Sequence, residues 1–334
     1  MRTTLTTVSD RLEIVELPHA AANHSFAEDI ETGLRTVPKR LASKYLYDDL
    51  GSALFDAITK LPEYYLTRAE TDILREWGWE IVRALNAPVE FLELGSGSAV
   101  KTRLLIEEGL RAQGTLRYSP IDISRDALMS SAISLVDSYP NLSMRAYVGD
   151  YFQVLASPEL SFRRRVLAMF MGSNIGNYTP QATHELFSLL AKTLRPGDGL
   201  LLGTDLKKDR ATLELAYDDP TGVTAAFNLN LLGRINRELG ADFDLHSFRH
   251  IASYDERRGS VDSFLEAQTE QRVKIKALNM DLMFAEKERI QTEFSYKFTV
   301  EDVAALGRQA GFRLAKSWYD RPKRFGLHLL VREG

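Results

Sequence analysis

The residues at 89–101, Val-Glu-Phe-Leu-Glu-Leu-Gly-Ser-Gly-Ser-Ala-Val-Lys, are the stretch of the chain that most suggests chemistry. An apolar run, Val89 to Leu94, is typical of a buried strand, and a helical pattern follows from Lys101. Between them, Gly95 and Gly97 allow positive φ and a close approach of the backbone to a ligand. The turn predicts a binding site for a nucleotide-like ligand, and a plain strand-to-helix turn is the alternative.

Acidic residues follow the next two predicted strands. Asp122 closes Leu116 to Ile121, at about the distance downstream where an acid binds the hydroxyls of a ribose. Asp150 follows Ser143 to Val148. The turn lacks the third glycine of the dinucleotide fingerprint, which sets a diphosphate on a helix N-terminus. We therefore expect S-adenosylmethionine as the cofactor and treat an NAD-dependent dehydrogenase as the weaker alternative.

The composition argues against several classes of partner. The chain has 334 residues and a net charge of −4, so no overall basic field draws it to nucleic acid. The densest basic run, Arg163 to Arg165, is interpreted as a solvated loop. The chain has no cysteine and its histidines lack metal-ligand spacing, so we expect no disulfide and no metal site.

The beginning of the chain does not look like a signal peptide. Met1 to Leu17 lacks an unbroken apolar core, and no later segment approaches the length needed to span a membrane. We expect a cytoplasmic monomer with a small-molecule substrate and no membrane or nucleic-acid partner.

Strand and helix patterns alternate through the middle of the chain. Strand candidates are Val89 to Leu94, Leu116 to Ile121, Ser143 to Val148, Val166 to Met171 and Gly199 to Thr204. Such alternation predicts an α/β fold with a doubly wound parallel sheet of Rossmann-like type.

The rest of the chain predicts a second lobe. Residues 1–60 are expected to form a helical segment of this lobe, and 206–286 an insertion that covers the ligand crevice at the carboxyl ends of the strands. The cofactor-binding domain is then expected to comprise 61–205 and 287–334.

Several short blocks of residues, spread in order over roughly residues 38 to 330, together form a recognisable pattern. They are Tyr47-Asp48-Asp49, Leu61-Pro62-Glu63-Tyr64-Tyr65, Thr67-Arg68-Ala69-Glu70, Glu93-Leu94-Gly95-Ser96-Gly97, Pro120-Ile121-Asp122-Ile123-Ser124, Gly172-Ser173-Asn174-Ile175-Gly176-Asn177, Gly203-Thr204-Asp205-Leu206, Tyr217-Asp218-Asp219 and Thr292-Glu293-Phe294-Ser295-Tyr296-Lys297-Phe298. Together they resemble the histidine-specific methyltransferase family, which makes histidine betaine (hercynine) for ergothioneine. The resemblance implies a class I methyltransferase fold with an added lobe that closes on a free amino acid.

The resemblance also implies roles for individual residues. The cofactor S-adenosylmethionine would be bound by Gly95, Gly97, Lys101, Asp122, Asp150 and Tyr151. Asp150 and Tyr151 would flank the adenine, although a turn-forming Gly-Asp pair also explains Asp150.

For the substrate, the resemblance assigns Asn177 and Tyr217 to the α-carboxylate, Tyr65 to the α-amine, and Glu293 with Ser295 to the imidazole. Glu293 and Ser295 are two residues apart in a strand-like run, so both face the same side of the strand. The alternative to a binding role is that this run is an edge strand whose polar side faces water. Tyr65 is the expected catalytic residue, which orients the amine for three successive methyl transfers. No dedicated base is required, because deprotonating an α-ammonium with a pKa near 8 costs only about 1 kcal/mol at neutral pH.

One position departs from the family pattern. Ser263 stands where the ergothioneine enzymes usually carry a larger apolar residue, so if this position lines the side-chain pocket, we expect that pocket to be roomier or more polar here. Relatives that methylate tryptophan derivatives make another amino acid the alternative substrate, whereas Glu293 and Ser295 favour imidazole. A non-catalytic protein that binds S-adenosylmethionine is the alternative from a different class.

Overall fold

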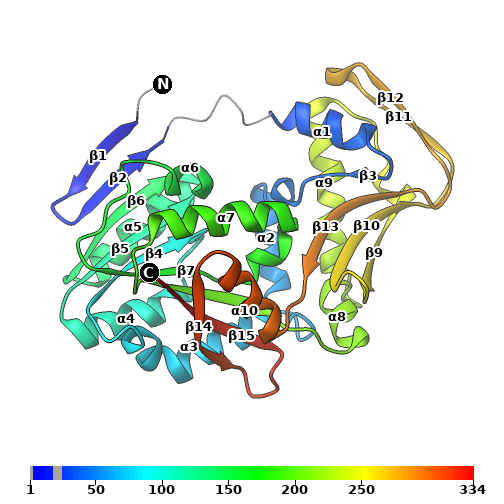
Figure 1. Cartoon of the computed structure of the whole chain (residues 1–334). Coiled ribbons are helices and arrows are strands. Elements are labelled where there is room, and N and C mark those ends of the chain that lie inside the picture. The colour runs from blue at the N-terminus through cyan, green and yellow to red at the C-terminus, as the bar shows by residue number, and fades with distance from the viewer. Residues whose placement is uncertain (1–2, 18–24) are drawn as a thin grey trace. The chain divides into compact units, whose positions relative to one another are not determined.

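The chain alternates between two compact units. The computed structural model describes residues 3–17 and 25–334 (Figure 1). Unit 1 comprises Met1–Ala20, Arg68–Leu206 and Phe298–Gly334, and unit 2 comprises Ala21–Thr67 and Lys207–Lys297. The chain therefore leaves unit 1 twice and returns to it twice.

Unit 1 is built on a nine-stranded sheet with the order β1-β2-β6-β5-β4-β7-β8-β15-β14 (Figure 1). The strands are β1 Thr4–Ser9, β2 Leu12–Glu16, β4 Val89–Leu94, β5 Leu116–Asp122, β6 Leu142–Val148, β7 Arg165–Phe170, β8 Gly199–Asp205, β14 Phe312–Tyr319 and β15 Phe325–Arg332. Strands β2, β6, β5, β4, β7 and β8 run parallel, while β15 pairs antiparallel with both β8 and β14. The predicted doubly wound parallel sheet is confirmed.

Helices pack on both faces of this sheet. They are α3 Leu66–Arg83, which begins at the unit boundary, α4 Thr102–Gln113, α5 Arg125–Ser138, α6 Tyr151–Leu155, α7 Pro180–Thr193 and α10 Val300–Gln309, with the 3-10 turn η2 Asn174–Asn177. On one face Leu92 packs in one core with Leu186 of α7 and Val303 of α10. On the other face Gly109 of α4 lies against Phe91, because successive strand residues point to opposite sides. The central strands β4 and β8 are buried along their whole lengths.

The N-terminal residues differ from the predicted helical segment at 1–60. The hairpin of β1 and β2 joins the sheet beside β6, and Leu12, Ile14 and Val15 are buried there. Leu12 and Ile14 alternate with Glu13, which is the two-residue period of a strand, and pairing with β6 satisfies the backbone of β2. Residues 1–2 and 18–24 of the predicted segment lie outside the described residues.

Unit 2 contains a second sheet, in the order β3-β13-β10-β9. Its strands are β3 Lys39–Arg40, β9 Phe248–Asp255, β10 Ser260–Ala267 and β13 Arg289–Tyr296, and a separate hairpin is formed by β11 Gln271–Ile275 and β12 Met280–Phe284. The helical elements are α1 Phe26–Arg35, η1 Ser43–Leu46, α2 Asp49–Ile58, α8 Arg210–Tyr217, α9 Val223–Leu239, η3 Leu245–Ser247 and η4 Lys276–Leu278. Leu231 and Leu232 of α9 pack with Leu265 of β10 and Ile290 of β13 in one core.

The observed boundaries of unit 2 also differ from the predicted domains. Residues 61–67 and 287–297 belong to unit 2, although both were expected in the cofactor-binding domain. The second of these stretches contains β13, which pairs with β10 and β3 of unit 2. The hydrogen-bonded sheet therefore keeps β13 in unit 2, and the chain returns to unit 1 at Phe298, which bridges to Leu206.

Candidate functional site

The glycine turn of unit 1 lies at the carboxyl ends of β4 and β5. Gly95 and Gly97 adopt φ of +70° and +51°, the left-handed region that favours glycine. The Gly95 N–H donates to the Ile121 carbonyl over 2.9 Å, and the Gly97 N–H donates to Asp122 Oδ2 over 2.8 Å. A Cβ at Gly97 would meet no atom within 4 Å, so φ rather than crowding selects glycine there.

Asp122 holds this turn in place. Its Oδ1 accepts a second backbone hydrogen bond, from the Ser124 N–H over 2.9 Å. A carboxylate has about four acceptor sites, so two backbone donors leave capacity for the hydroxyl groups of a ribose. The residues of the turn therefore fit the cofactor that the sequence predicts.

Lys101 forms an ion pair with Glu70 of α3. Glu70 is fully buried, and it also accepts a hydrogen bond from the Gly172 N–H over 2.8 Å. One carboxylate thus ties the segment after β4 to the turn after β7. The predicted contact of Lys101 with the cofactor stays a prediction, since the geometry shows its ammonium engaged with Glu70.

Glu93 lies beneath the glycine turn and is 4% exposed. Its carboxyl group accepts hydrogen bonds from the Tyr118 hydroxyl and, over 2.7 Å, from the Thr102 hydroxyl. Burial outweighs these hydrogen bonds and raises the pKa of Glu93 to about 7. This group can therefore change its protonation state near neutral pH.

Asp150 and Tyr151 lie where β6 leads into α6. Asp150 is the N-cap of α6, and its Oδ1 accepts the Phe152 N–H over 2.8 Å. Tyr151 stacks on Phe152 with ring centroids 5.5 Å apart, and its hydroxyl contacts that of Tyr178. The capping role accounts for the position of Asp150. The expected contact of Asp150 and Tyr151 with the adenine stays a prediction.

Asn177 ends the 3-10 turn η2, close to the end of β7. The turn starts from Ser173, whose φ is +58°, and the Ser173 hydroxyl accepts the Asp205 N–H over 2.9 Å. The structure thus places Asn177 in unit 1, whereas Tyr65, Tyr217, Glu293 and Ser295 all belong to unit 2.

Three of the residues in unit 2 are joined by hydrogen bonds. The Tyr217 hydroxyl lies 2.9 Å from Ser295 Oγ, and Lys297 Nζ lies 2.7 Å from the former and 2.9 Å from the latter. All three residues are buried. Glu293 points to the same face of β13 as Ser295, as the two-residue spacing predicts.

Tyr65 is also paired with a lysine. Its hydroxyl accepts a hydrogen bond from Lys208 Nζ over 2.6 Å, and the same Nζ lies 4.8 Å from the centre of the Tyr65 ring. Tyr65 is 1% exposed. Each of the two tyrosines assigned to the substrate therefore has a lysine ammonium at its hydroxyl.

Tyr47 is a further residue close to this group. Tyr47 is 41% exposed as a whole residue, but its hydroxyl is shielded from water; this desolvation and, after it, the negative charge of Glu293 raise the pKa of Tyr47 well above its usual range. The rings of Tyr64 and Tyr217 meet edge to face, with centroids 6.4 Å apart. An aromatic surface thus lies beside the carboxylate of Glu293.

Lys208, Lys297 and Tyr47 were not singled out from the sequence. Lys297 could have been found, because the same two-residue spacing that joins Glu293 to Ser295 continues to Lys297. Tyr47 stands in one of the blocks that carry the family resemblance. Lys208 follows Lys207 in a polar stretch and gives no such signal.

Ser263 lies directly opposite Glu293 in the pairing of β10 with β13. Residues that face each other in an antiparallel pair project from the same face of the sheet. Among the described residues, the Ser263 hydroxyl is one of the few buried side-chain groups without a hydrogen-bond partner. The neighbour of Glu293 on this face is therefore small and polar.

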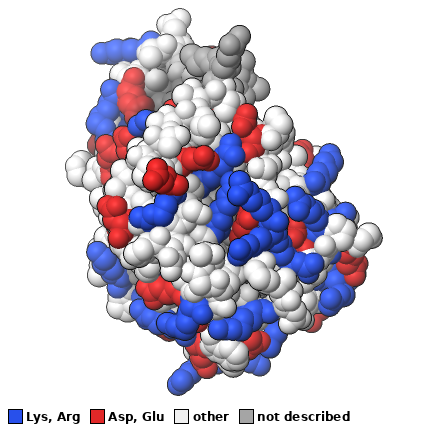
Figure 2. All heavy atoms as spheres, turned by 90° about the vertical axis from the view of Figure 1, so that its left-hand side faces the viewer, with Lys and Arg blue, Asp and Glu red and all other residues white. Residues whose placement is uncertain are grey.

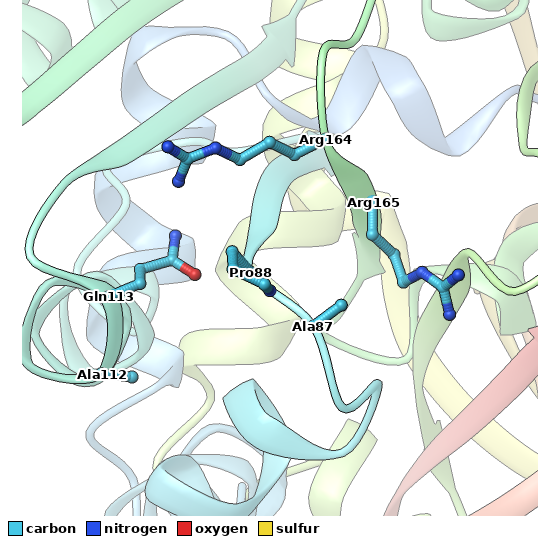
Figure 3. A pocket seen from close by; sticks show the side chains of 6 residues that line it. All are labelled: Ala87, Pro88, Ala112, Gln113, Arg164 and Arg165. Carbon is cyan, nitrogen blue, oxygen red and sulfur yellow. The ribbon is translucent and has the colours of Figure 1, made fainter.

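A hollow of about 580 Å³ lies at the amino ends of the central strands β4 and β7 of unit 1 (Figure 3). It is lined by Ala87, Pro88, Ala112, Gln113, Arg164 and Arg165. These residues adjoin the starts of β4 and β7 and the end of α4, whereas the glycine turn follows the end of β4. Figure 3 shows Arg164 on the side of Gln113 and Arg165 pointing the other way. The hollow is therefore separate from the glycine turn.

The charges of the surface are mixed. Figure 2 shows Lys and Arg side chains gathered on part of one face, with Asp and Glu beside and among them. Within residues 3–17 and 25–334, no cluster of three or more histidines or carboxylates is placed to hold a metal ion. No helix in the same part of the chain is long and apolar enough to cross a membrane.

The strand order and the glycine turn define the class of protein. Unit 1 has a parallel sheet in the order β6-β5-β4-β7-β8, which is extended by the antiparallel β15. Asp122 holds the glycine turn that follows β4. This arrangement is that of a class I S-adenosylmethionine-dependent methyltransferase. The profile of the histidine-specific, S-adenosylmethionine-dependent methyltransferases matches residues 26–332. The chain belongs to this family.

Characterised relatives are similar over nearly the whole chain. It is 44% identical to the histidine N-alpha-methyltransferase of Mycolicibacterium smegmatis, over 93% of this chain and 96% of that protein. It is 42% identical to the enzyme of the same name from Mycobacterium tuberculosis, with the same coverage. It is 26% identical to the L-tryptophan methyltransferase trpM of Psilocybe serbica, over 88% of each chain.

Proposed function

We propose that the chain transfers methyl groups from S-adenosylmethionine to the α-amino group of free L-histidine, three times in succession, to give hercynine as in ergothioneine biosynthesis. The observation that carries this proposal is the face of β13 on which Glu293 and Ser295 lie together beside Tyr217. A carboxylate and a hydroxyl can bind the two nitrogens of one imidazole. The similarity to two histidine N-alpha-methyltransferases supports the same substrate.

The cofactor supplies an electrophilic methyl group on a sulfonium. Gly95, Gly97 and Asp122 are the residues whose geometry fits its binding, with Lys101, Asp150 and Tyr151 proposed beside them. The task of the chain is then to present the amine with its lone pair free and aimed at the methyl group, since positioning alone can supply much of the rate.

Individual residues of the chain divide the work of orienting histidine. We assign the α-amine to Tyr65, the α-carboxylate to Tyr217 and Asn177, and the imidazole to Glu293 and Ser295. The amine must lose its proton before it attacks the methyl group, and we propose that orientation by Tyr65 suffices without a dedicated base. Aromatic faces such as that of Tyr64 can stabilise the trimethylammonium product.

The two units would divide these tasks. Unit 1, with the glycine turn, would bind the cofactor, and unit 2 would supply most of the substrate contacts. We expect the protein to act as a cytoplasmic monomer, and light scattering after gel filtration tests its oligomeric state.

A second substrate class has one observation in its favour. The small and unpartnered Ser263 beside Glu293 leaves room for a larger ring, and a tryptophan methyltransferase is among the relatives. Against it, an indole would leave part of the Glu293 carboxylate without partners, at a cost of about 1–3 kcal/mol.

The deciding experiment is methylation of an equimolar panel of free amino acids, with tryptophan and histidine included. The purified protein is incubated with S-adenosylmethionine, and mass gains of one, two and three methyl groups are recorded for each amino acid. Trimethylated histidine is the expected product. Methylation of another amino acid would show that the chain is a methyltransferase with that amino acid as its substrate. Cofactor binding without any methylation would support a non-catalytic protein.

A further inference from the structure

We propose that Glu70 is a positioning residue that couples binding of the cofactor to binding of the amino acid, because its one carboxylate holds both Lys101 and the turn that leads to Asn177. This inference rests on the proposed function, in which Lys101 meets the cofactor and Asn177 meets the α-carboxylate of histidine. All three residues belong to unit 1. The proposed function gives Glu70 itself no task.

Glu70 lies on α3, and its two carboxylate oxygens have different partners. Oε2 accepts a hydrogen bond from the Lys101 ammonium, and Oε1 accepts one from the Gly172 N–H over 2.8 Å. Glu70 is fully buried, whereas the Lys101 side chain is 27% exposed. A carboxylate group is planar and rigid, so a shift of one oxygen also shifts the other. Lys101, after the glycine turn, and Gly172, after β7, are therefore linked through one side chain.

The sheet leaves space for this carboxylate at Gly203 of β8. A Cβ at Gly203 would lie 2.5 Å from Glu70 Oε1 and 3.2 Å from the Cα of Met171. Glycine inside a strand often marks such a close approach. A larger residue at 203 would push the carboxylate away from the Gly172 N–H. The position of the Glu70 carboxylate is thus built into the sheet.

The hydrogen bond at Gly172 acts on the segment that carries Asn177. Gly172 and Ser173 both have positive φ, +77° and +58°, and η2 follows directly and ends at Asn177. The Gly176 N–H donates to the Ser173 carbonyl over 2.9 Å, so the segment is a compact turn. The Gly172 N–H connects this turn to the buried carboxylate. Ordering of Gly172 therefore orders the backbone that leads to Asn177.

The other end of the link is an ammonium that can serve two anions. An ammonium has three donors, of which Glu70 uses one, so donors remain for a ligand. The anionic group of S-adenosylmethionine is the carboxylate of its methionine portion, which suits Lys101. A cofactor that fixes Lys101 also fixes Glu70 and Gly172, so the amino acid meets a turn that is already ordered and binds more tightly. By linkage, the amino acid strengthens cofactor binding by the same factor.

The test is a cycle of four dissociation constants, measured by calorimetry for S-adenosylhomocysteine and L-histidine, each alone and each with the other saturating. In the wild type, either ligand should strengthen binding of the other by about fivefold or more. Glu70→Gln keeps the length of the side chain but loses the ion pair, so this factor should fall to about twofold or less. Glu70→Asp keeps the charge but is too short to reach both partners, so the factor should fall there as well.

Glu76→Gln is the matched control, because Glu76 is an exposed carboxylate of the same helix. It should keep the wild-type factor. A residue that only supports the fold would weaken binding of each ligand alone and leave the factor unchanged. A wild-type factor below about twofold, or an equal factor in Glu70→Gln and the wild type, would therefore overturn the proposal. Circular dichroism and thermal melting establish whether each variant is folded.

Methylthioadenosine separates this link from a direct effect of one ligand on the other. It retains the adenosine and the sulfur of the cofactor but lacks the carboxylate that would engage Lys101. It should therefore leave the affinity for histidine unchanged, whereas S-adenosylhomocysteine raises it. Equal effects of the two compounds would show that the coupling does not pass through Lys101 and Glu70, and would overturn the proposal.

Hydrogen exchange of the Gly172 amide in the wild type covers the case in which the Glu70 variants do not fold. Exchange requires the hydrogen bond from Gly172 to Glu70 to open, so S-adenosylhomocysteine alone should slow it by about fivefold or more. Methylthioadenosine should not slow it. Unchanged exchange with S-adenosylhomocysteine bound would overturn the proposal.

The outcomes separate this inference from the proposed function. Trimethylated histidine together with any of the overturning results would refute the inference alone. If the wild-type protein binds the cofactor but no histidine, the proposed function fails and this inference fails with it.

Discussion

Lys208 donates a hydrogen bond to the Tyr65 hydroxyl over 2.6 Å, and its ammonium lies over the Tyr65 ring. The phenol oxygen therefore already accepts from one cation. A nearby like charge disfavours a second cation, such as the α-ammonium of an amino acid. If Tyr65 contacts the α-amine, Lys208 favours the neutral amine, which is the form that can attack a methyl group.

Replacing Lys208 with Met should shift the pH dependence of kcat. Loss of the positive charge allows the bound amine to keep its proton to higher pH, so the rise of kcat with pH should move upward by about one unit. Steady-state rates between pH 6 and 9 measure this shift. Lys207→Met is the matched control, because Lys207 is the adjacent lysine and is exposed. A shift of equal size in both variants would contradict the role given to Lys208.

Removal of the Tyr65 hydroxyl should slow the reaction itself. Tyr65→Phe keeps the buried ring and should lower kcat by up to about tenfold, the value of one hydrogen bond to a neutral amine. The KM for S-adenosylmethionine should stay unchanged. Tyr254→Phe, at another buried tyrosine of unit 2, is the control and should leave both constants near those of the wild type. An unchanged kcat in Tyr65→Phe would remove Tyr65 from the reaction.

The sequence predicted the parts of the fold that follow from local pattern. The strand candidates at 89–94 and 199–204 match β4 and β8 because continuous apolar runs identify strands buried on both faces. The hairpin of β1 and β2 was missed, because both strands are short and β1 is exposed along its whole length. Its place in the sheet depends on the pairing of β2 with β6, which is distant in sequence. The unit boundary at Lys297 was missed because it depends on pairing between β13 and β10, which is not local.

Prediction of the candidate site had a similar limit. The residue types at Glu293 and Ser295 and their two-residue spacing suggested a shared face, and the structure places both on β13. The same spacing continues to Lys297, whereas Lys208 is recognisable only from its contacts, since lysine is ordinarily a surface residue. The hydrogen bond from the half-buried Lys208 to the buried Tyr65 is a tertiary relationship, which no spacing rule encodes.

Asp122 should affect both the cofactor and the glycine turn. The two carboxylate oxygens of Asp122 accept hydrogen bonds from the Gly97 and Ser124 N–H groups. Asp122→Asn removes the negative charge and leaves one oxygen that can accept. Affinity for S-adenosylhomocysteine should fall by about tenfold to a hundredfold, as expected when a hydrogen bond to a charged group is lost. Calorimetry measures this change, and Asp126→Asn serves as control because the Asp126 side chain is 99% exposed. Equal affinities of Asp122→Asn and the wild type would exclude Asp122 from the cofactor site.

Ser263 should control how large a ring the protein accepts. Ser263→Met places a long apolar side chain beside Glu293, and it should lower the ratio of kcat/KM for tryptophan to that for histidine by about tenfold. Competition assays with both amino acids give this ratio directly. Ser253→Met is the control, since Ser253 pairs with Asp262 and projects from the other face of β10 and β9. A ratio that changes equally in both variants would show that Ser263 does not line the substrate pocket.

Glu93 should make stability depend on pH in an unusual direction. Its pKa rises from 4.5 to about 7 on folding, so between these values the folded protein holds a proton that the unfolded chain has released. The stabilising effect of this proton is complete below about pH 4.5 and is lost as the pH rises to about 7, a change of about 3 kcal/mol. Glu93→Gln is neutral at every pH and lacks this dependence.

The free energy of unfolding of Glu93→Gln, relative to the wild type, should therefore increase from pH 5 to pH 7 and stay constant above it. Urea unfolding of both proteins at several pH values measures the difference, in which other titrating groups cancel. Glu107→Gln is the control, because Glu107 is an exposed carboxylate of α4, the helix that also carries Thr102. A difference that is flat with pH would mean that Glu93 stays ionised beneath the glycine turn, with the hydrogen bonds from Tyr118 and Thr102 outweighing its burial.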